Sequence, residues 1–568
     1  MSRPHIFWYA IDVMRFFACL CVVLSACTSP PATKATTVSQ PLLTTALPPL
    51  ATTPVVGPPV FAPVPDDRRL VLLVTASVQG YVEPCGCTGD PLGGIARLAG
   101  VVEEARRVYG DRVFFLDGGD LLFEKPDDNA AVDRCQADAR TELLVSTYAR
   151  VGLAATLRGP LDDVRGKDTR DALLARHQVK SLEAASSVVV SGGAMKVLVI
   201  AATPTDSPDT INTVVAAAAK GVDAVVVLSR GDARATKALA SSFRGVDVVV
   251  VGTAGEAPSP PEKVGDAVLI QPGWQAQHLG VVELVLQGRA GRAPLPLDDR
   301  VAVADGRKKL LDVRVAEIDK LLAALEPGTT KTFQQQRRDR FAAERVALDV
   351  DVSAPITGPH IVARAVPLKR GMTEEPTAFA ALKAYETAIP TLVSSCEAGV
   401  VCPEPAAGVP RYVGAQTCQA CHAAAWDFWQ KALVEVKATD TSGQQRTHLS
   451  GHVKAWDTLV SAGRDKDRSC VGCHSAGFDT EGGACTTTTL VEKQLTGVQC
   501  ESCHGAGSEH VQGGGDKTKL LRNVPETRCR QCHLPPHIES AASFVFNERL
   551  LHILGEGHGA ARRAELSP

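Results

Sequence analysis

The chain has 568 residues, too many for one hydrophobic core, so about three or four domains are expected. Its 60 Lys and Arg residues against 63 Asp and Glu give a formal charge of -3, which offers no case for nucleic acid or acidic lipid as a partner. Apolar residues make up 45% of the chain and aromatic residues 5%, as in a soluble protein, but 17 Cys residues indicate disulfides, metal sites or covalent cofactors.

Residues 1–26 predict a signal peptide. The apolar run from Phe16 to Leu24 follows Arg15 and is too short to span a bilayer as a mature helix. The sequence Leu24-Ser25-Ala26-Cys27 resembles a bacterial lipoprotein signal, which implies cleavage before Cys27 and a lipid on that residue. An ordinary secretory signal is the alternative. Either signal takes the protein out of the cytoplasm, and we expect a lipid-anchored protein of the bacterial cell envelope, in the outer membrane or facing the periplasm.

The start of translation is a separate hypothesis. Asp12 does not suit the basic beginning of a signal peptide, whereas Met14 followed by Arg15 does, so we expect translation to begin at Met14. Precursor peptides that contain Ile6 to Val13 would contradict this start. Residues 27–67, rich in Thr, Pro and Ala, predict an extended tether.

Residues 68–298 predict a layered α/β domain. Near-continuous apolar runs alternate with helical stretches, as expected for sheets that helices cover. The runs lie at 70–76, 112–120, 195–202, 223–229, 246–252 and 279–286.

Residues 299–409 predict a helical hairpin and a connector. The charged stretch 303–348 has a helical pattern that Pro327-Gly328 interrupts. A short β-like piece at 359–368 and a helix near 376–389 follow.

Residues 410–560 have almost no hydrophobic periodicity, although they contain three of the five Trp residues. Such a segment needs something other than a patterned core to pack around. Four repeats of Cys-x-x-Cys-His supply it, because two thiols at this spacing reach the two vinyl groups of one porphyrin and the His reaches the iron. We therefore predict four covalent haem c groups in a mainly α-helical domain, attached at Cys418, Cys421 and His422; Cys470, Cys473 and His474; Cys500, Cys503 and His504; and Cys529, Cys532 and His533.

Zinc and a disulfide framework are the disfavoured alternatives for these cysteines. A zinc site does not need a His directly after the second Cys in every repeat.

Further His residues in the segment could provide the second axial ligands of the irons. Two axial ligands favour electron transfer, whereas an iron with an empty position can bind a small molecule. These are His448, His452, His510, His537, His552 and His558.

The segment resembles the tetrahaem cytochrome c family typified by the electron carrier of hydroxylamine oxidation. The resemblance rests on YVGAQTCQACH (412–422), SGHVKAWDTL (450–459), GVQCESCHGAGSEH (497–510) and the end of the segment up to His558. It implies His452, His510 and His558 as distal ligands and leaves one haem five-coordinate. His448, His537 or His552 would otherwise fill that position.

The α/β domain resembles the metallophosphoesterase domain of 5′-nucleotidases, through LGGIARLAGVVEEAR (92–106) and FFLDGGDLLF (114–123). That family binds two metals through Asp, His and Asn residues at the strand ends. Only Asp120 remains here, because the other positions hold Ser77-Val78-Gln79, Gly159-Pro160, Arg230 and the run Gly252 to Gly255. One carboxylate cannot hold two divalent cations, so we expect a fold whose hydrolytic site is lost, with phosphoesterase activity the least favoured function.

Five other cysteines leave alternatives open. Cys85-Gly86-Cys87 follows the first strand, and Cys135 is a possible third thiol beside it. These cysteines form a structural disulfide, a metal site assisted by Asp120 or a thiol redox pair, and the disulfide is favoured. Cys396 and Cys402 flank a loop and form either a disulfide with each other or two thiols.

The sequence thus predicts an exported tetrahaem cytochrome that transfers electrons, anchored to the membrane by its lipid, with an inactive α/β scaffold or docking module. Its partners would be redox proteins or quinol-linked donors. The main alternative is a multihaem oxidoreductase that acts on a small nitrogen or sulfur species at a five-coordinate haem.

Overall fold

The computed structural model describes residues 53–61, 68–85, 91–124, 131–252, 257–351, 356–439, 445–533 and 544–566. Met14, Cys27, Cys87 and His537 lie outside the described residues, and for Cys85 and His448 only the backbone is described. Of the described helices, none is long and apolar enough to cross a membrane.

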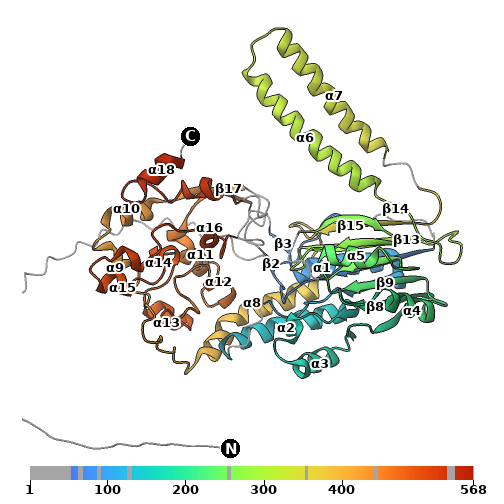
Figure 1. The fold of residues 1–568 in the computed structure, drawn as a ribbon, viewed down its shortest axis with the longest axis horizontal. Helices are drawn as coiled ribbons and strands as arrows, with labels where there is room; N and C mark the ends of the chain where they lie inside the picture. The colour runs from blue at the N-terminus through green and yellow to red at the C-terminus, as the bar shows by residue number, and fades with distance from the viewer. Residues whose placement is uncertain are drawn as a thin grey trace, which may run out of the picture. The chain divides into compact units, whose positions relative to one another are not determined.

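Two sheets form the centre of the α/β part (Figure 1). The first runs in the order β14 (Leu297–Asp298), β15 (His360–Pro367), β13 (His278–Val285), β1 (Arg69–Thr75), β4 (Val113–Asp117), β5 (Leu153–Leu157) and β6 (Ser181–Leu182). The second runs in the order β11 (Ser259–Val264), β12 (Ala267–Gln271), β10 (Val248–Val251), β9 (Ala224–Ser229), β8 (Met195–Ala202) and β7 (Ser187–Gly192). In both sheets the central strands are parallel, so their carboxyl ends meet at one edge.

The core of this part lies in three layers. Side chains of β1, β4 and β13 pack against those of β8, β9 and β10 between the two sheets. Helices α1 (Ile95–Tyr109), α2 (Ala131–Arg150) and α8 (Pro376–Glu397) cover the outer face of the first sheet, and α4 (Pro208–Ala218) and α5 (Ala233–Ala240) cover that of the second. This arrangement confirms the predicted layered α/β sandwich, because strands buried on both faces must be apolar throughout.

The α/β part extends beyond residue 298, where we expected it to end. Strand β15 pairs with β13 along its full length, from His278↔Pro367 to Val285↔His360. Helix α8 contributes Phe379, Leu382 and Ile389 to the core beside the first sheet. It also continues past Pro390, because proline removes only one hydrogen bond of the ladder and Val393 on the next turn is buried.

The predicted helical hairpin is present between β14 and β15. Helices α6 (Arg300–Ala324) and α7 (Thr329–Asp351) lie side by side (Figure 1). Their shared core is small, with Leu311, Ile318, Leu322 and Phe341 buried between them. Ion pairs such as Arg307–Glu344 add to the contact.

Residues 411–566 consist mainly of short helices and turns. The helices are α9 (Ala415–Gln419), α10 (Ala423–Lys431), α11 (Ala455–Ser461), α12 (Arg468–Val471), α13 (Thr487–Glu492), α14 (Cys500–His504), α15 (Ser508–Gln512), α16 (Glu526–Cys529), α17 (Phe546–Leu550) and α18 (Ala560–Leu566), with one hairpin of β16 (Val434–Thr439) and β17 (Gln445–Ser450).

Two disulfides correct our expectations. Cys135 in α2 pairs with Cys396 in α8, and Cys402 pairs with Cys485. The proposed Cys396–Cys402 bridge is therefore wrong, and Cys135 is not available as a third thiol beside Cys85 and Cys87. Close packing of α2 against α8 decides the first pairing, because it brings together residues 261 positions apart in the sequence.

Candidate haem sites

Each Cys-x-x-Cys-His repeat begins in or next to a short helical turn. Cys418 lies in α9, Cys470 in α12 and Cys529 in α16, and α14 contains the whole third repeat. In a helix, positions i, i+3 and i+4 share one face, so the two thiols and the imidazole of the third repeat lie on one face of α14. The described disulfides use other cysteines.

The histidines of three repeats lie next to distal histidines. Two imidazoles that bind one metal on opposite sides through bonds of about 2 Å have ring centres roughly 6 Å apart. The ring centres are 6.2 Å apart for His422 and His510, 6.0 Å for His452 and His533, and 6.1 Å for His504 and His558. The fold therefore brings each of the three distal histidines that the family resemblance implies to a different repeat.

The orientation of several rings also suits an iron ligand. The Nδ1 atoms of His474, His504, His510 and His558 lie 2.6, 2.6, 2.9 and 2.6 Å from the backbone oxygens of Ala455, Leu521, Asp516 and Ile553. With Nδ1–H donating to a carbonyl, Nε2 is left as the ligating atom. Burial lowers the pKa of His474 and His504, and lowers that of His452 to about 4, which keeps these rings neutral.

His474 differs from the other three proximal histidines. Within the described residues it has no ring contact with another histidine, and His552 has none either. The side chains of His448 and His537, which we named as alternative ligands, lie outside the description. The second repeat thus contains a proximal histidine, His474, that faces no distal histidine among the described side chains.

The apolar core of the segment is too small for its length. The cluster contains six buried residues, Leu459, Val471, Phe478, Ala484, Leu490 and Leu495. Helix α10 carries Trp426, Phe428 and Trp429, yet none of its residues is buried by the protein. Porphyrins at the four repeats would supply the missing apolar surface, so the residues present fit the predicted cofactor.

The four attachment sites adjoin one another. The Cys500 thiol contacts that of Cys418 and raises its pKa, and the Cys473 thiol contacts that of Cys532 and lowers its pKa. Cys529 also raises the pKa of Cys503. The sites therefore follow one another in space as first repeat, third, fourth and second.

Glu501 has a role that the motif does not reveal. It occupies a variable position of the third repeat, is 2% exposed and accepts backbone N–H groups of Val413, Gly414 and Gly507 at 2.7–3.1 Å. These bonds hold the chain before α9 against α14, and so position the first repeat beside the third. The buried Glu501 carboxylate gives these backbone N–H groups the acceptors that they need. No pattern in the sequence indicates this role.

The edge where β1 and β4 end is where the family resemblance places a hydrolytic site. Asp120 is buried, and its Oδ1 accepts the Leu161 N–H at 2.8 Å. A Cβ atom at Gly159 would lie 2.1 Å from the same Oδ1, so an Asn side chain does not fit there. Ser77 donates its hydroxyl to the Gly252 oxygen. No cluster of three or more metal-binding side chains occurs among the described residues.

Buried carboxyl groups at this edge predict how the stability of the α/β part changes with pH. Asp117 is fully buried and accepts from Thr75, Thr156 and Gly119, yet burial raises its pKa to about 7. Its stabilising contribution is therefore complete below about pH 4 and is lost as the pH rises towards 7, on the order of 4 kcal/mol. In Asp117→Asn this change should disappear, and urea unfolding of both proteins at pH 4, 5, 6 and 7 would measure it; equal pH slopes would contradict it.

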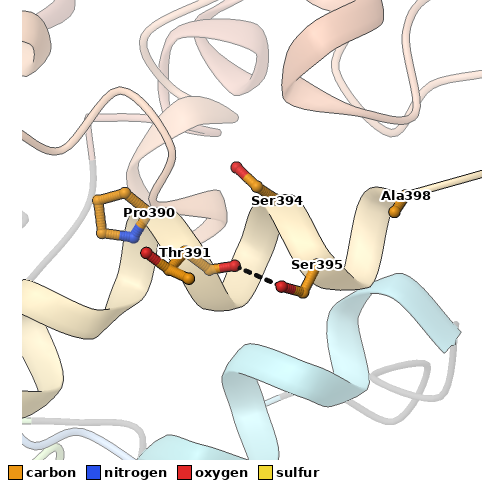
Figure 2. Close-up of a pocket in the computed structure, with 5 residues that line it drawn as sticks. All are labelled: Pro390, Thr391, Ser394, Ser395 and Ala398. Atoms are coloured by element: carbon orange, nitrogen blue, oxygen red, sulfur yellow. Dashed lines mark hydrogen bonds between the residues drawn. The ribbon is translucent and has the colours of Figure 1, made fainter.

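One surface hollow does not add a site. It measures about 550 Å³ and is lined by Pro390, Thr391, Ser394 and Ser395 of α8 and by Ala398, which directly follows the helix (Figure 2). Ser395 donates to the Thr391 backbone oxygen at 2.9 Å. These small, uncharged side chains offer no group for catalysis or metal binding.

Comparison with known proteins gives a family match for the C-terminal segment and alignments with solved structures. Residues 417–505, in the C-terminal segment, match the family model for cytochrome c554 and c-prime. This match implies covalently bound haem c. Among curated proteins, the chain is similar to cytochrome c-554 of Nitrosomonas europaea, 32% identical over 140 residues that cover 22% of this chain and 57% of the relative. The chain thus spans little more than half of that relative.

The solved structures that align with the chain include two from Thermus thermophilus. Thermus thermophilus sulfate thiohydrolase SoxB, in complex with glycerol, is 14% identical with a TM-score of 0.39 over 58% of this chain and 62% of its own. A 5′-nucleotidase precursor, also from Thermus thermophilus, is 16% identical with a TM-score of 0.37 over 69% and 74%. At these scores the α/β assignment rests on the observed sheets and helices.

Proposed function

We propose that the chain is an exported, lipid-anchored tetrahaem c-type cytochrome that transfers electrons. The observation that carries the proposal is the set of three histidine pairs with ring centres 6.0–6.2 Å apart, each joining a repeat to a distal histidine. An iron bound by two imidazoles changes oxidation state without changing ligands, as electron transfer requires. The chain's own residues would attach the porphyrins and orient the imidazoles.

The order of the attachment sites supports the same function. Cysteines of the first and third repeats interact, as do those of the second and fourth, so porphyrins attached there would lie close together. The α/β part then serves as a scaffold or docking module without hydrolytic activity, because Asp120 is its one acidic ligand position and Gly159 leaves no room for another side chain. Redox proteins or quinol-linked donors would supply and accept the electrons.

Export and anchoring are supported by chemistry in two parts of the chain. Two long-range disulfides suit an oxidising compartment. The Leu24-Ser25-Ala26-Cys27 sequence supplies the expected lipid attachment residue. Cys27→Ala should release the protein from the membrane fraction with its haem content unchanged; retention in that fraction would overturn the lipid anchor.

The decisive experiment is an intact mass of the full chain, produced in a host that matures c-type cytochromes, combined with a haem-stained gel. Four haems per chain are expected. A lower number in the fully matured protein would contradict the count, and an unstained band would overturn the function.

A second candidate function follows from His474. Because no described histidine faces it, the haem at Cys470 and Cys473 has an open position if His448 and His537 do not fill it, and the protein would then be an oxidoreductase for a small nitrogen or sulfur species. Reduced protein that binds carbon monoxide at one haem per chain would favour this function. Unchanged spectra under carbon monoxide would leave electron transfer alone.

The angles between the imidazole planes predict spectroscopic differences. The planes are 25° apart for His422 and His510 and 84° apart for His504 and His558. The splitting of the iron d orbitals falls as the two planes turn from parallel to perpendicular. Electron paramagnetic resonance of the oxidised protein should therefore show a rhombic low-spin signal from the His422–His510 site and a highly anisotropic one from the His504–His558 site, beside the signal of the His452–His533 site, whose planes are 51° apart. His558→Ala should remove only the second; identical low-spin signals would contradict the arrangement.

A further inference from the structure

The attachment helix of the second repeat, α12, contacts the α/β part through a buried polar cluster. Arg464, which precedes α12, binds both carboxylate oxygens of Glu83 at 2.8 and 2.5 Å and also pairs with Asp467. The same guanidinium lies 3.8 Å from the sulfur of Cys470. Asp467 is fully buried and accepts from Gln136 of α2 at 2.6 Å. Arg464 therefore lies between a haem-attaching cysteine and a carboxylate of the α/β part.

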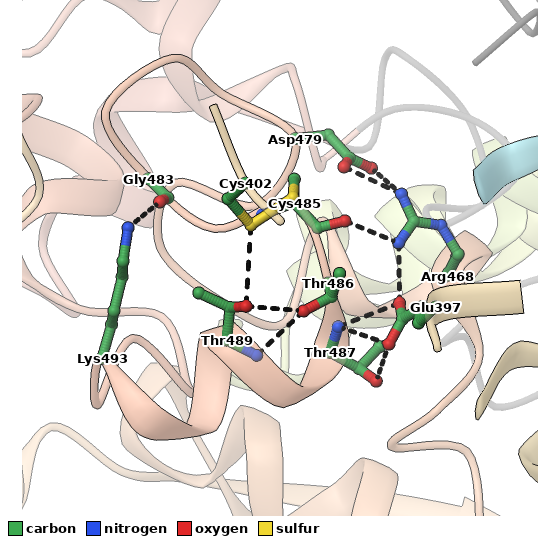
Figure 3. The surroundings of a disulfide bond; sticks show 10 residues. All are labelled: Glu397, Cys402, Arg468, Asp479, Gly483, Cys485, Thr486, Thr487, Thr489 and Lys493. Carbon is green, nitrogen blue, oxygen red and sulfur yellow. Dashed lines mark hydrogen bonds and ion pairs between the residues drawn. A yellow bond between two sulfur atoms is a disulfide. The ribbon is translucent and has the colours of Figure 1, made fainter. Parts of the chain in front are cut away.

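A second arginine repeats this pattern on the other side of α12. Arg468 binds Glu397, the last residue of α8, at 2.8 Å, and both oxygens of Asp479 at 2.8 Å (Figure 3). Glu397 is held in place by the N–H and hydroxyl of Thr487. The side chains of Arg468 and Glu397 are only 6% and 4% exposed, so solvent screens this pair weakly.

The charges around α12 do not cancel. Among the groups at ion-pair distance, two guanidinium groups face four carboxylates, namely Glu83, Asp467, Glu397 and Asp479, which gives these pairs a formal charge of -2. Burial raises the pKa of Glu83, and the Arg464 guanidinium opposes that rise by favouring the ionised carboxylate. Two of these carboxylates, Glu83 and Glu397, belong to the α/β part. Negative charge in a weakly screened environment favours the oxidised iron, which carries one more positive charge than the reduced iron.

We propose that Glu83 and Glu397 of the α/β part lower the reduction potential of the haem attached at Cys470 and Cys473. This inference rests on the proposed function, since it requires a haem at that repeat. The two residues act by their charge, and their ion pairs with Arg464 and Arg468 hold them beside α12. The α/β part is then an electrostatic regulator of one haem as well as a scaffold.

The test is a spectroelectrochemical titration of the full chain with all its haems. In Glu83→Gln, which keeps the size and hydrogen-bonding shape, one of the four one-electron steps should move to higher potential. A shift of about tenfold in the reduction equilibrium constant, or about 59 mV for one electron, is expected, with smaller shifts in the other three steps. Glu397→Gln should act in the same direction, and Glu83→Asp, which keeps the charge, should restore most of the original potential.

Glu404→Gln is the matched control, because Glu404 pairs with Arg411 at the surface and its side chain is 79% exposed. All four steps should stay unchanged in it. In a Cys470→Ala/Cys473→Ala chain, where this haem is absent, Glu83→Gln should move none of the remaining steps. The melting temperature of each variant separates loss of folding from loss of charge.

If Glu83→Gln and Glu397→Gln both keep four haems and none of their reduction potentials changes, the inference is overturned and the proposed function stays intact. Equal shifts of all four steps would also overturn it, because the effect would then not belong to one haem. A chain without haem would overturn the proposed function itself.

Discussion

Replacing both Cys529 and Cys532 by alanine is expected to lower the haem content from four to three per chain and to destabilise the C-terminal segment strongly. Without the porphyrin, His452 and His533 would face an unfilled space in a segment whose buried apolar cluster has only six residues. The segment would lose the apolar surface that it buries against the porphyrin. This should lower its free energy of unfolding by several kcal/mol, about as much as removing more than one large core side chain. Intact mass and the thermal loss of the Soret circular dichroism would measure both effects.

Gln531→Ala is the control for this variant, since Gln531 lies between the two cysteines and its side chain accepts a hydrogen bond from Arg528 at the surface. It keeps the spacing of the repeat and should retain four haems. An unchanged mass in the double alanine variant would exclude covalent attachment at this repeat.

Removing the Cys402–Cys485 disulfide is expected to destabilise the protein by about 2–5 kcal/mol, because the bond closes a loop of 83 residues in the unfolded chain. The loss should fall on the C-terminal segment, since Cys485 precedes α13, and Thr489 of that helix contacts Cys402 (Figure 3). Denaturant unfolding of Cys402→Ser/Cys485→Ser, followed by haem absorbance, would measure the shift.

The single variant Cys402→Ser separates the crosslink from the side chain. It should lose as much stability as the double variant, because either change opens the same loop. Reduction of the native protein should move its unfolding midpoint in the same direction. Equal midpoints for the reduced and oxidised protein would contradict a stabilising role.

Features with a local period could be predicted from the sequence. The apolar runs that became β1, β8, β9 and β10 are continuous, as strands buried on both faces require. The hairpin of α6 and α7 was indicated by a charged helical pattern with a Pro-Gly break. The four Cys-x-x-Cys-His repeats carry their own spacing, so the attachment residues needed no knowledge of the fold.

Features that depend on distant residues could not be predicted in the same way. The partner of Cys396 is Cys135, which only the packing of α2 against α8 brings near. The length of α8 was underestimated because a proline inside a helix normally marks an end. Glu83, Glu397 and Glu501 are ordinary carboxylates in sequence, and their roles appear only when their long-range partners are known.

The two disulfides also constrain how the protein matures. Thioether bonds to porphyrin require Cys418 and the seven other repeat cysteines as thiols, whereas Cys135, Cys396, Cys402 and Cys485 must be oxidised. In each repeat the wrong disulfide needs no folding, because its two cysteines are three residues apart, while the correct bridges form only after α2, α8 and the C-terminal segment have met. Biogenesis therefore favours haem attachment on the still extended segment first, with the long-range bridges formed last and closing the folded protein.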